Sequence, residues 1–132
     1  MTVQVKLEIL SGAYAISRLD RTAAIPDWAD GEGFVAIART EDELSVVCLA
    51  GRVPADVKSD EGWRCLKFVG PFAFDETGIA AAVLNPLAEA AIGIFLVSTF
   101  DTDYLLVKAG DFERSQRILI EAGHSVLAQA ER

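Results

Sequence analysis

Residues 92–108 read IGIFLVSTFDTDYLLVK, in which two apolar runs enclose a short polar stretch. The runs 92–98 and 104–108 are rich in β-branched and aromatic side chains, and each has the length of a strand. The residues between them, 99–103, are typical of a turn. We therefore predict a β-hairpin at this point of the chain.

A helix is predicted before the hairpin, because apolar residues recur there at helical spacing. These residues are Ile79, Val83, Leu87 and Ala90. Thr77 is in the position of an N-cap, and the acidic residues Asp75 and Glu76 lie where the positive end of a helix favours negative charge. Pro86 lies inside the pattern. Because proline lacks a backbone N–H, we expect it to kink the helix or to split off its last turn.

A second helix is predicted after the hairpin, with Asp111 placed to cap its start. Its inward-facing residues are Ile118, Leu119 and Ala122. Gly123 lies where the end of a helix favours a positive φ. With strands expected at 63–69 and 124–127, the order is strand, helix, strand, strand, helix, strand. This order is the split β-α-β arrangement of a ferredoxin-like α+β domain.

The first half of the chain is predicted to be mostly β. Residues 3–9 alternate between apolar and polar side chains, which is the period of a strand with one buried face. Residues 13–19 are expected to pair with this strand as a hairpin. The runs 34–39 and 44–49 form a second predicted hairpin.

Two segments of the first half contain glycine, proline and charged residues, which are typical of loops. Residues 20–33 are interpreted as a loop or a short helix, and residues 51–62 as a connecting segment. The predicted domains are therefore 1–60, a degenerate and mostly β half, and 61–132, a complete βαββαβ domain.

Composition and charge exclude several classes of protein. At 132 residues the chain suits one domain or two very small ones. The net charge of -8 argues against nucleic acid as a partner, because binding to a phosphate backbone needs a basic stripe. The apolar runs are far shorter than the roughly 20 residues that cross a bilayer, so no membrane partner is predicted. The N-terminus lacks the pattern of a secretory signal, and we expect a cytoplasmic protein.

Candidate catalytic or metal-ligating residues are few, so we predict no catalytic residues, no metal and no cofactor. Cys48 and Cys65 each lie in an apolar run and are interpreted as buried thiols, with a redox pair or a metal site as the alternative. His124 is the single histidine, and its place at the start of a predicted strand favours a structural role. The acidic run 41–43 could hold a hard cation but is typical of a solvated hairpin tip.

The sequences GIAAAVL at 78–84 and PLAEA at 86–90, followed by the hairpin, resemble an ACT domain. In particular, VSTFDTDYLLV at 97–107 is similar to the central hairpin of the ACT repeats in aspartate kinases and CASTOR-type arginine sensors. The resemblance is good over 63–127 and implies a mostly antiparallel sheet with helices on one face. It implies two ACT-like halves side by side, as in the small bacterial tandem-ACT proteins.

The resemblance also implies a non-catalytic regulatory protein that binds an amino acid at an interface between ACT units, often formed on dimerisation. In such sites the loop after the first strand and the start of the first helix hold the ligand, and the central hairpin closes over it. The matching residues are Phe72, Asp75, Thr77, Gly78, Ile79, Thr99, Phe100, Asp101, Thr102 and Asp103.

The chemistry of these residues agrees with that site. The helix start after Thr77 offers unpaired backbone N–H groups to a carboxylate, and Gly78 allows close approach. Asp103, or else Asp101, can accept a hydrogen bond from an ammonium group or a basic side chain. The alternative interpretation is local: aspartate commonly satisfies turns, and Thr77 could simply cap the helix.

Our leading hypothesis is an amino-acid sensor, for which an acidic site would favour a basic amino acid such as arginine or lysine. Its output would pass through a homo-oligomer, most simply a dimer, or through a regulatory partner protein, by population shift. The alternative is a structural domain for protein–protein interaction or dimerisation that binds no small ligand. A small enzyme is a third hypothesis, and it requires His124 and Cys48 or Cys65 to meet at an accessible cleft.

Overall fold

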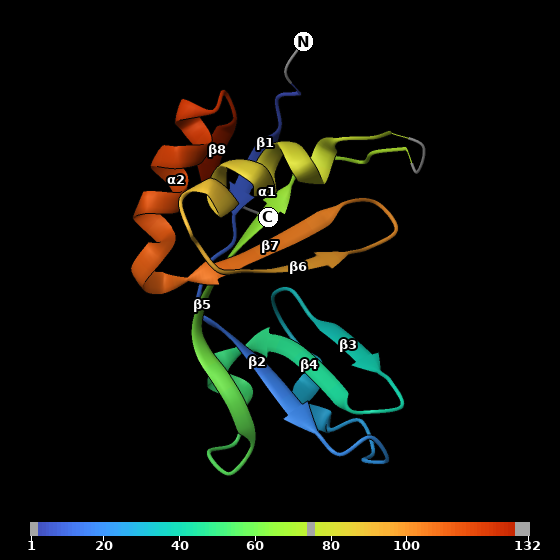
Figure 1. Cartoon of the computed structure of the whole chain (residues 1–132). Coiled ribbons are helices and arrows are strands. Elements are labelled where there is room, and N and C mark those ends of the chain that lie inside the picture. Colours follow the sequence, from blue (N-terminus) through green and yellow to red (C-terminus); the bar gives the residue numbers. More distant parts are fainter. Residues whose placement is uncertain (1–2, 74–75, 129–132) are drawn as a thin grey trace. The chain divides into compact units, whose positions relative to one another are not determined.

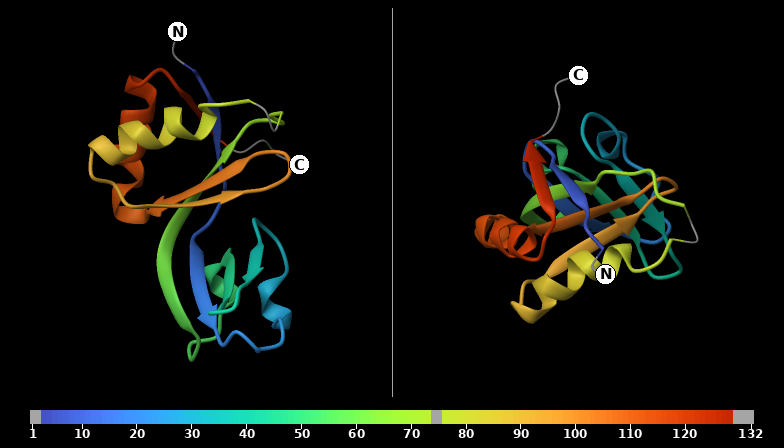
Figure 2. Two further views of the ribbon diagram at one scale, coloured as in Figure 1. Left: turned by 45° about the vertical axis from the view of Figure 1, so that its right-hand side comes forward. Right: turned by 90° about the horizontal axis from the view of Figure 1, so that it is seen from above.

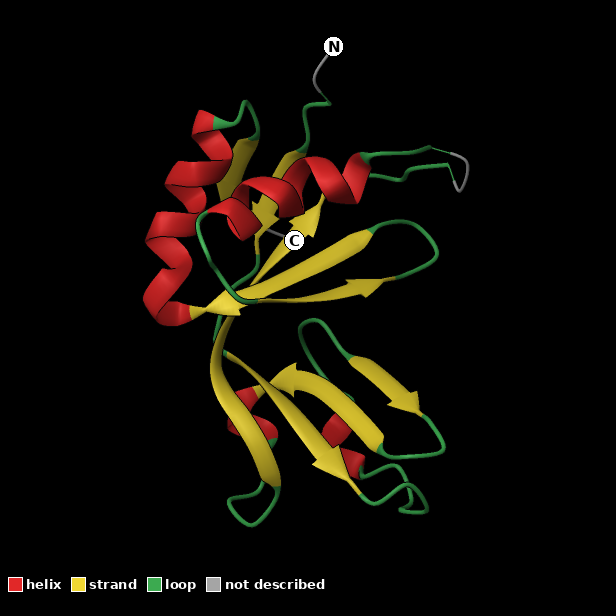
Figure 3. Ribbon diagram, viewed as in Figure 1, coloured by secondary structure: helices red, strands yellow, loops and turns green. Residues whose placement is uncertain are grey.

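The computed structural model describes residues 3–73 and 76–128, and it has the mixed α+β architecture that the sequence predicts. Figure 3 shows the strands and helices of the chain, the helices being α-helices and short 3-10 turns. The strands are β1 Lys6–Ile9, β2 Tyr14–Leu19, β3 Ala36–Arg39, β4 Leu44–Leu49, β5 Lys58–Phe68, β6 Ile94–Ser98, β7 Asp103–Lys108 and β8 Ser125–Ala128. The helices are α1 Ile79–Glu89 and α2 Phe112–Glu121, and the 3-10 turns are η1 Asp27–Ala29, η2 Ala50–Arg52 and η3 Ala109–Asp111.

The chain divides into two compact units. Unit 1 consists of Met1–Ser11 together with Arg64–Arg132, and unit 2 consists of Gly12–Trp63. The predicted half 1–60 therefore differs from the observed division, because residues 1–11 belong to unit 1. The reason is strand pairing: β1 pairs with β5 and with β8, both of which lie in the second half of the chain.

The sheet of unit 1 has the order β6-β7-β5-β1-β8. The predicted succession from β5 to β8, with α1 and α2 between the strands, is confirmed (Figure 1). The β6–β7 hairpin is antiparallel, as predicted, with Ser98 opposite Asp103. The N-terminal strand β1 is the addition: it lies between β5 and β8, antiparallel to the first and parallel to the second.

Both helices cover one face of this sheet (Figure 2). Alternate residues of β1 and β5, such as Leu7 and Phe68, point to the same side and are fully buried, as the period-two pattern requires. They meet the apolar faces of the two helices. The buried core of unit 1 is Val5, Leu7, Leu66, Phe68, Val83, Leu87, Ile92, Leu105, Val107, Phe112 and Leu119.

The predicted hairpin of residues 3–9 with 13–19 is wrong. Instead, β1 pairs with residues 66–68 of β5, and β2 pairs with β4 and with residues 58–63 of β5. Both pairings are possible because β5 is 11 residues long. The sequence predicts that its first residues, from Lys58 to Gly62, belong to a connecting segment, because they are charged or polar. They nevertheless form a strand, and Ser59 bonds the buried hydroxyl of Ser17 at 2.8 Å.

The sheet of unit 2 has the order β3-β4-β2-β5. The predicted β3–β4 hairpin is confirmed, and the Thr40 hydroxyl accepts the N–H groups of Asp42 and Glu43 at its acidic tip. The segment 20–33 is a loop with one short 3-10 turn, η1, as expected. The Arg52 guanidinium holds it by donating to the carbonyls of Trp28 at 3.0 Å and Glu32 at 2.8 Å.

No helix in the part of the chain that the structure describes is long and apolar enough to cross a lipid bilayer.

Candidate functional site

A cavity of about 360 Å³ lies in unit 1, between the β5–α1 loop, the start of α1 and the β6–β7 turn. Its lining residues are Phe72, Ala73, Glu76, Gly78, Ile79, Ala80, Ala81, Ser98, Thr99, Phe100, Asp101, Thr102 and Asp103. The fold thus brings together two segments that are about twenty residues apart in sequence. Its volume is at the lower end of the range of about 300–1,000 Å³ that small-molecule sites occupy.

Most of the residues that the sequence singled out line this cavity. They are Phe72, Gly78, Ile79, Thr99, Phe100, Asp101, Thr102 and Asp103. Thr77 is exposed and is not among the lining residues, and Asp75 lies outside the described residues. Sequence reasoning missed Ala73, Glu76, Ala80, Ala81 and Ser98 as lining residues. Ser98 could have been found from the hairpin register, because it lies directly opposite Asp103.

The start of α1 forms one side of the cavity. The predicted N-cap at Thr77 is wrong: the N-cap residue is Gly78, with φ of 79°, and no side chain caps the helix. Ala82 donates the first bond, to the Gly78 carbonyl at 3.0 Å, so the N–H groups of residues 79–81 have no acceptor within the helix. The first turn of α1, residues 79–82, holds no acidic side chain. The positive end of the helix is therefore not neutralised by its own first turn.

Three acidic residues also line the cavity: Glu76 on the β5–α1 loop, Asp101 in the β6–β7 turn and Asp103 at the start of β7. Asp103 accepts a hydrogen bond from the Ser98 hydroxyl, and Glu76 accepts the Ala73 N–H at 2.8 Å. Asp101 is exposed, and its carbonyl accepts the Phe72 N–H at 3.0 Å, which joins the two walls of the cavity. Among the described lining residues there is no lysine or arginine. The acidic part of the lining therefore favours a positively charged group.

The threonine hydroxyls build the turn that carries the aspartates. Thr102 is 7% exposed, and its hydroxyl donates to the Phe68 carbonyl at 2.7 Å. The Thr99 hydroxyl donates to the Thr102 carbonyl at 3.0 Å, and the Thr99 N–H donates to the same carbonyl at 2.8 Å. These bonds fix the backbone on either side of Asp101. The two threonines thus shape the cavity through the turn conformation.

Apolar side chains complete the lining. Phe72 and Ile79 are half-buried and pack against the core of unit 1. Phe100, at the tip of the turn, is 79% exposed. A ligand in the cavity would therefore meet a fixed apolar wall on the core side and an accessible aromatic ring at the hairpin tip.

The other chemically reactive residues lie elsewhere. Cys48 and Cys65 are free and fully buried, and burial raises the pKa of the Cys65 thiol to about 12. Both are buried thiols, as interpreted from the sequence. The ring nitrogens of His124 are both within hydrogen-bond distance of backbone groups, so this side chain is not free to act as a base. Within the described residues no group of histidine, cysteine and acidic side chains could hold a metal ion.

Comparison with known proteins identifies a family for this part of the chain. A sequence model of the ACT domain matches residues 58–121. This chain contains an ACT domain. A second family model, described as an N-terminal domain, matches residues 12–56. The ACT match covers both walls of the cavity.

Over 82 residues the chain is 38% identical to the human protein "Cytosolic arginine sensor for mTORC1 subunit 1". The match covers 56% of this chain and 25% of that protein, so the chain spans about a quarter of the length of this relative. An Agrobacterium tumefaciens protein solved by X-ray crystallography is 56% identical, with a TM-score of 0.93, and the match covers 99% of this ACT protein and 98% of the other.

The regulatory subunit of aspartate kinase from Thermus thermophilus, in its ligand-free form, has the same fold with a TM-score of 0.57. It is 13% identical to this ACT domain chain, and the match covers 93% of this chain and 99% of that one. At this identity the likeness concerns the fold alone.

Proposed function

We propose that this ACT domain protein binds an amino acid in the cavity of unit 1 and acts as a regulator. The observation that carries the proposal is the pairing of two unlike walls. The start of α1 presents backbone N–H groups at residues 79–81, and the β6–β7 turn with the start of β7 presents the carboxylates of Asp101 and Asp103. An α-amino acid carries a carboxylate and an ammonium group on one carbon, and these two walls match its two charges.

The carboxylate of the ligand would bind at the start of α1. The amides of residues 79–81 are directed along the helix axis at its positive end, where an anion is stabilised by typically 0.3–1 kcal/mol at an exposed site. Because Gly78 has no side chain and its surroundings are open, the ligand can approach the backbone closely. This arrangement leaves the ammonium group for the acidic side.

The acidic side would bind the ammonium group and would favour a basic side chain. Asp103 is our preferred anchor because its carboxylate is oriented by Ser98, and a charge-assisted hydrogen bond contributes about 1.5–3 kcal/mol. The family relationship supports a basic amino acid as the ligand, since the human relative is named an arginine sensor. We infer that the output passes through a second copy of the chain or through a regulatory partner in the cytoplasm.

A thermal-shift screen against the common amino acids tests the proposal. A ligand present at about 100 times its dissociation constant stabilises the fold by roughly 2.7 kcal/mol, which raises the melting temperature measurably. We expect the largest shift from a basic amino acid. Asp103→Asn keeps an oxygen that can accept the Ser98 hydroxyl but removes the charge, and it should abolish most of the shift.

Asp42→Asn is the matched control, because it removes one exposed aspartate from the β3–β4 turn of unit 2 and should leave the shift intact. If no amino acid shifts the melting temperature, the proposal fails. A structural interaction domain without a small ligand would then be the better account.

A further inference from the structure

The helix that borders the cavity contains a proline that should interrupt it. Pro86 has no N–H, so the carbonyl of Ala82, four residues earlier, loses its partner within the helix. Yet α1 runs without a break from Ile79 to Glu89. Of the two outcomes predicted for Pro86, a kink or a split of the last turn, the split is therefore wrong. The Ala82 residue is partly buried, so a partner from outside the helix stabilises its carbonyl oxygen, because an acceptor removed from water without a hydrogen bond is costly.

That partner is the imidazole of His124, whose Nε2 lies 2.8 Å from the Ala82 oxygen. Its Nδ1 lies 3.0 Å from the backbone nitrogen of Val5, and that N–H can only donate. Nδ1 is therefore an acceptor, which places the ring proton on Nε2, where it is donated to Ala82. With 5% of its surface exposed, His124 is sealed from solvent in this role.

The end of α2 fixes where this imidazole lies. Gly123 has φ of 100°, and the His124 N–H donates to the Leu119 carbonyl at 3.0 Å, which closes the helix. The next residue, Ser125, donates its N–H to the Val5 carbonyl at 3.0 Å. Val5 therefore contacts the connection from both its N–H and its carbonyl. His124 joins three parts of unit 1: α1, the entry to β1 and the α2–β8 connection.

We propose that His124 is a positioning residue for the cavity. The Ala82 N–H donates a hydrogen bond to the carbonyl of the N-cap residue, Gly78, and the Ala82 carbonyl accepts one from the His124 imidazole. One residue thus links the imidazole to the helix end whose amides, 79–81, line the cavity. The position of these donors relative to the acidic wall depends on His124. Only the consequence for ligand binding rests on the proposed function, since the hydrogen-bonded chain exists without a ligand.

Two substitutions separate the two halves of this chain of bonds. In His124→Gln, the terminal amide nitrogen can occupy the place of Nε2 and donate to Ala82. In His124→Asn, the shorter side chain can place an oxygen near Nδ1 and accept from Val5, but it cannot reach Ala82. We expect ¹H–¹⁵N spectra of the full chain to show large shifts of the amides of residues 79–81 in the asparagine variant and small ones in the glutamine variant.

A third substitution, at Pro86, tests whether the missing proline N–H is the cause. In Pro86→Ala, residue 86 gains an N–H that can bond the Ala82 carbonyl within the helix. Adding His124→Asn to this background should then leave the amides of residues 79–81 near the positions they have in Pro86→Ala alone. A residue with only a general structural role would lower the melting temperature in every background and would show no such rescue. Equal amide shifts with and without Pro86 would overturn the proposal.

The unmodified protein provides an independent measurement if the asparagine variant does not fold. Long-range ¹H–¹⁵N spectra of the imidazole identify its tautomer, and we expect the proton on Nε2. A proton on Nδ1 would contradict the assignment. None of these measurements uses an amino acid, so their outcome is independent of the ligand screen. If the screen fails and these succeed, His124 still positions the helix, and only the ligand class is wrong.

Discussion

The two helices of unit 1 pack against one core, but they differ in how far their local sequence suits a helix and its C-terminal end. α2 holds no proline and ends at Gly123, which adopts the positive φ that suits glycine. α1 holds Pro86, and two residues after its last residue, Glu89, lies Ala91 with φ of 58°, which is unfavourable for a residue with a Cβ. The local sequence of α2 is enough to specify its end, whereas α1 depends on contacts from elsewhere in unit 1. The helix that lines the cavity is therefore the one whose local sequence departs from the usual helix pattern, at Pro86 and at Ala91.

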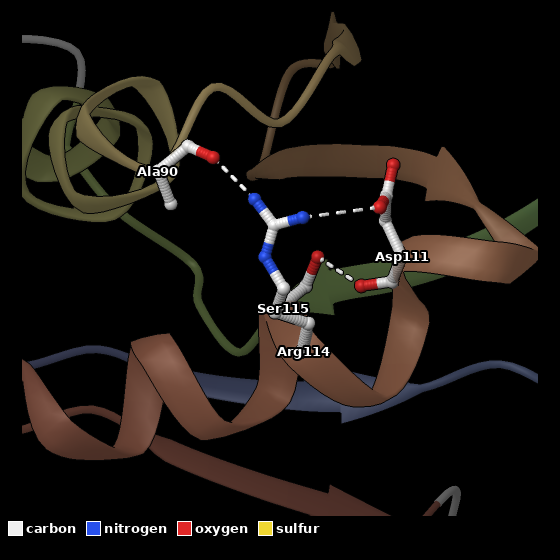
Figure 4. Close-up of polar contacts among 4 residues, drawn as sticks. All are labelled: Ala90, Asp111, Arg114 and Ser115. Carbon is white, nitrogen blue, oxygen red and sulfur yellow. Dashed lines mark hydrogen bonds and ion pairs between the residues drawn. The ribbon is translucent and has the colours of Figure 1, made fainter.

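His124 provides one of these contacts to α1, and Arg114 provides a second, at the end of α1 that is far from the cavity (Figure 4). Its guanidinium donates a hydrogen bond to the carbonyl of Ala90, the C-cap residue of α1, and lies 3.5 Å from the Asp111 carboxylate. The Ser115 hydroxyl donates to the Asp111 carbonyl at 2.7 Å. Asp111 is at the N-cap of α2, as predicted, but its side chain makes no capping bond and pairs with Arg114 instead. The start of α2 therefore supports the end of α1.

The largest effect on the free energy of unfolding is expected from substitutions that create a cavity in the core shared by the two helices. Leu87 of α1 and Leu119 of α2 are both fully buried, and replacing either by alanine should lower the free energy of unfolding by about 2–5 kcal/mol. Chemical denaturation measures this loss. Because α1 depends on tertiary contacts, Leu87→Ala should also speed amide hydrogen exchange within α1 more than elsewhere. In Leu119→Ala the faster exchange should spread over unit 1.

Uniform exchange in both variants would contradict the comparison. It would mean that α1 opens only when the whole of unit 1 unfolds, and that its local sequence is no weaker than that of α2.

The same contrast explains which elements the sequence could predict. The β6–β7 hairpin, the β3–β4 hairpin and the end of α2 at Gly123 are local, so neighbouring residues specify them. The place of β1 between β5 and β8 is decided by pairing of residues about 60 and 120 positions apart along the chain, and periodicity carries no such information. The start of β5 was not predicted as a strand because its side chains are polar and show no apolar pattern, although its backbone pairs with β2.

The cavity was predictable to the extent that family resemblance located its two walls. Details that depend on side-chain geometry were not. Thr77 has the chemistry of an N-cap, but the chain turns at Gly78 and the helix starts without a side-chain cap. Glu76 was interpreted as a charge at the helix start, whereas its carboxylate accepts the Ala73 N–H and lines the cavity. A sequence pattern places residues on an element but does not choose between two nearby acceptors.

A smaller effect is expected at the end of α2. Gly123→Ala forces a Cβ into the left-handed region and should lower the free energy of unfolding by about 1–2 kcal/mol. The nearest side chain, Gln4, would lie 3.6 Å from the new Cβ, so crowding adds little. Gly110→Ala is the control, because nothing lies within 4 Å of a Cβ there. Equal denaturation midpoints for the two variants would show that the end of α2 is not set by its glycine.

The smallest effect is expected at the corresponding position of α1. Ala91 closes the helix as Gly123 does in α2: its N–H donates to the Ala88 carbonyl and the following N–H, of Ile92, donates to Leu87, each at 3.0 Å. The left-handed conformation costs alanine about 1–2 kcal/mol, and glycine loses about 0.5–1 kcal/mol more chain entropy on folding. Ala91→Gly should therefore raise the free energy of unfolding, by about 0.5–1 kcal/mol.

Ala90→Gly is the matched control for this substitution. Ala90 has φ of -88°, so glycine gains nothing there and should destabilise the protein by about 0.5–1 kcal/mol. Opposite signs at two neighbouring positions, measured by chemical denaturation, would show that the strain lies at Ala91 itself. If both variants were destabilised, the positive φ of Ala91 would carry no measurable strain, and the difference between the two helices would reduce to Pro86.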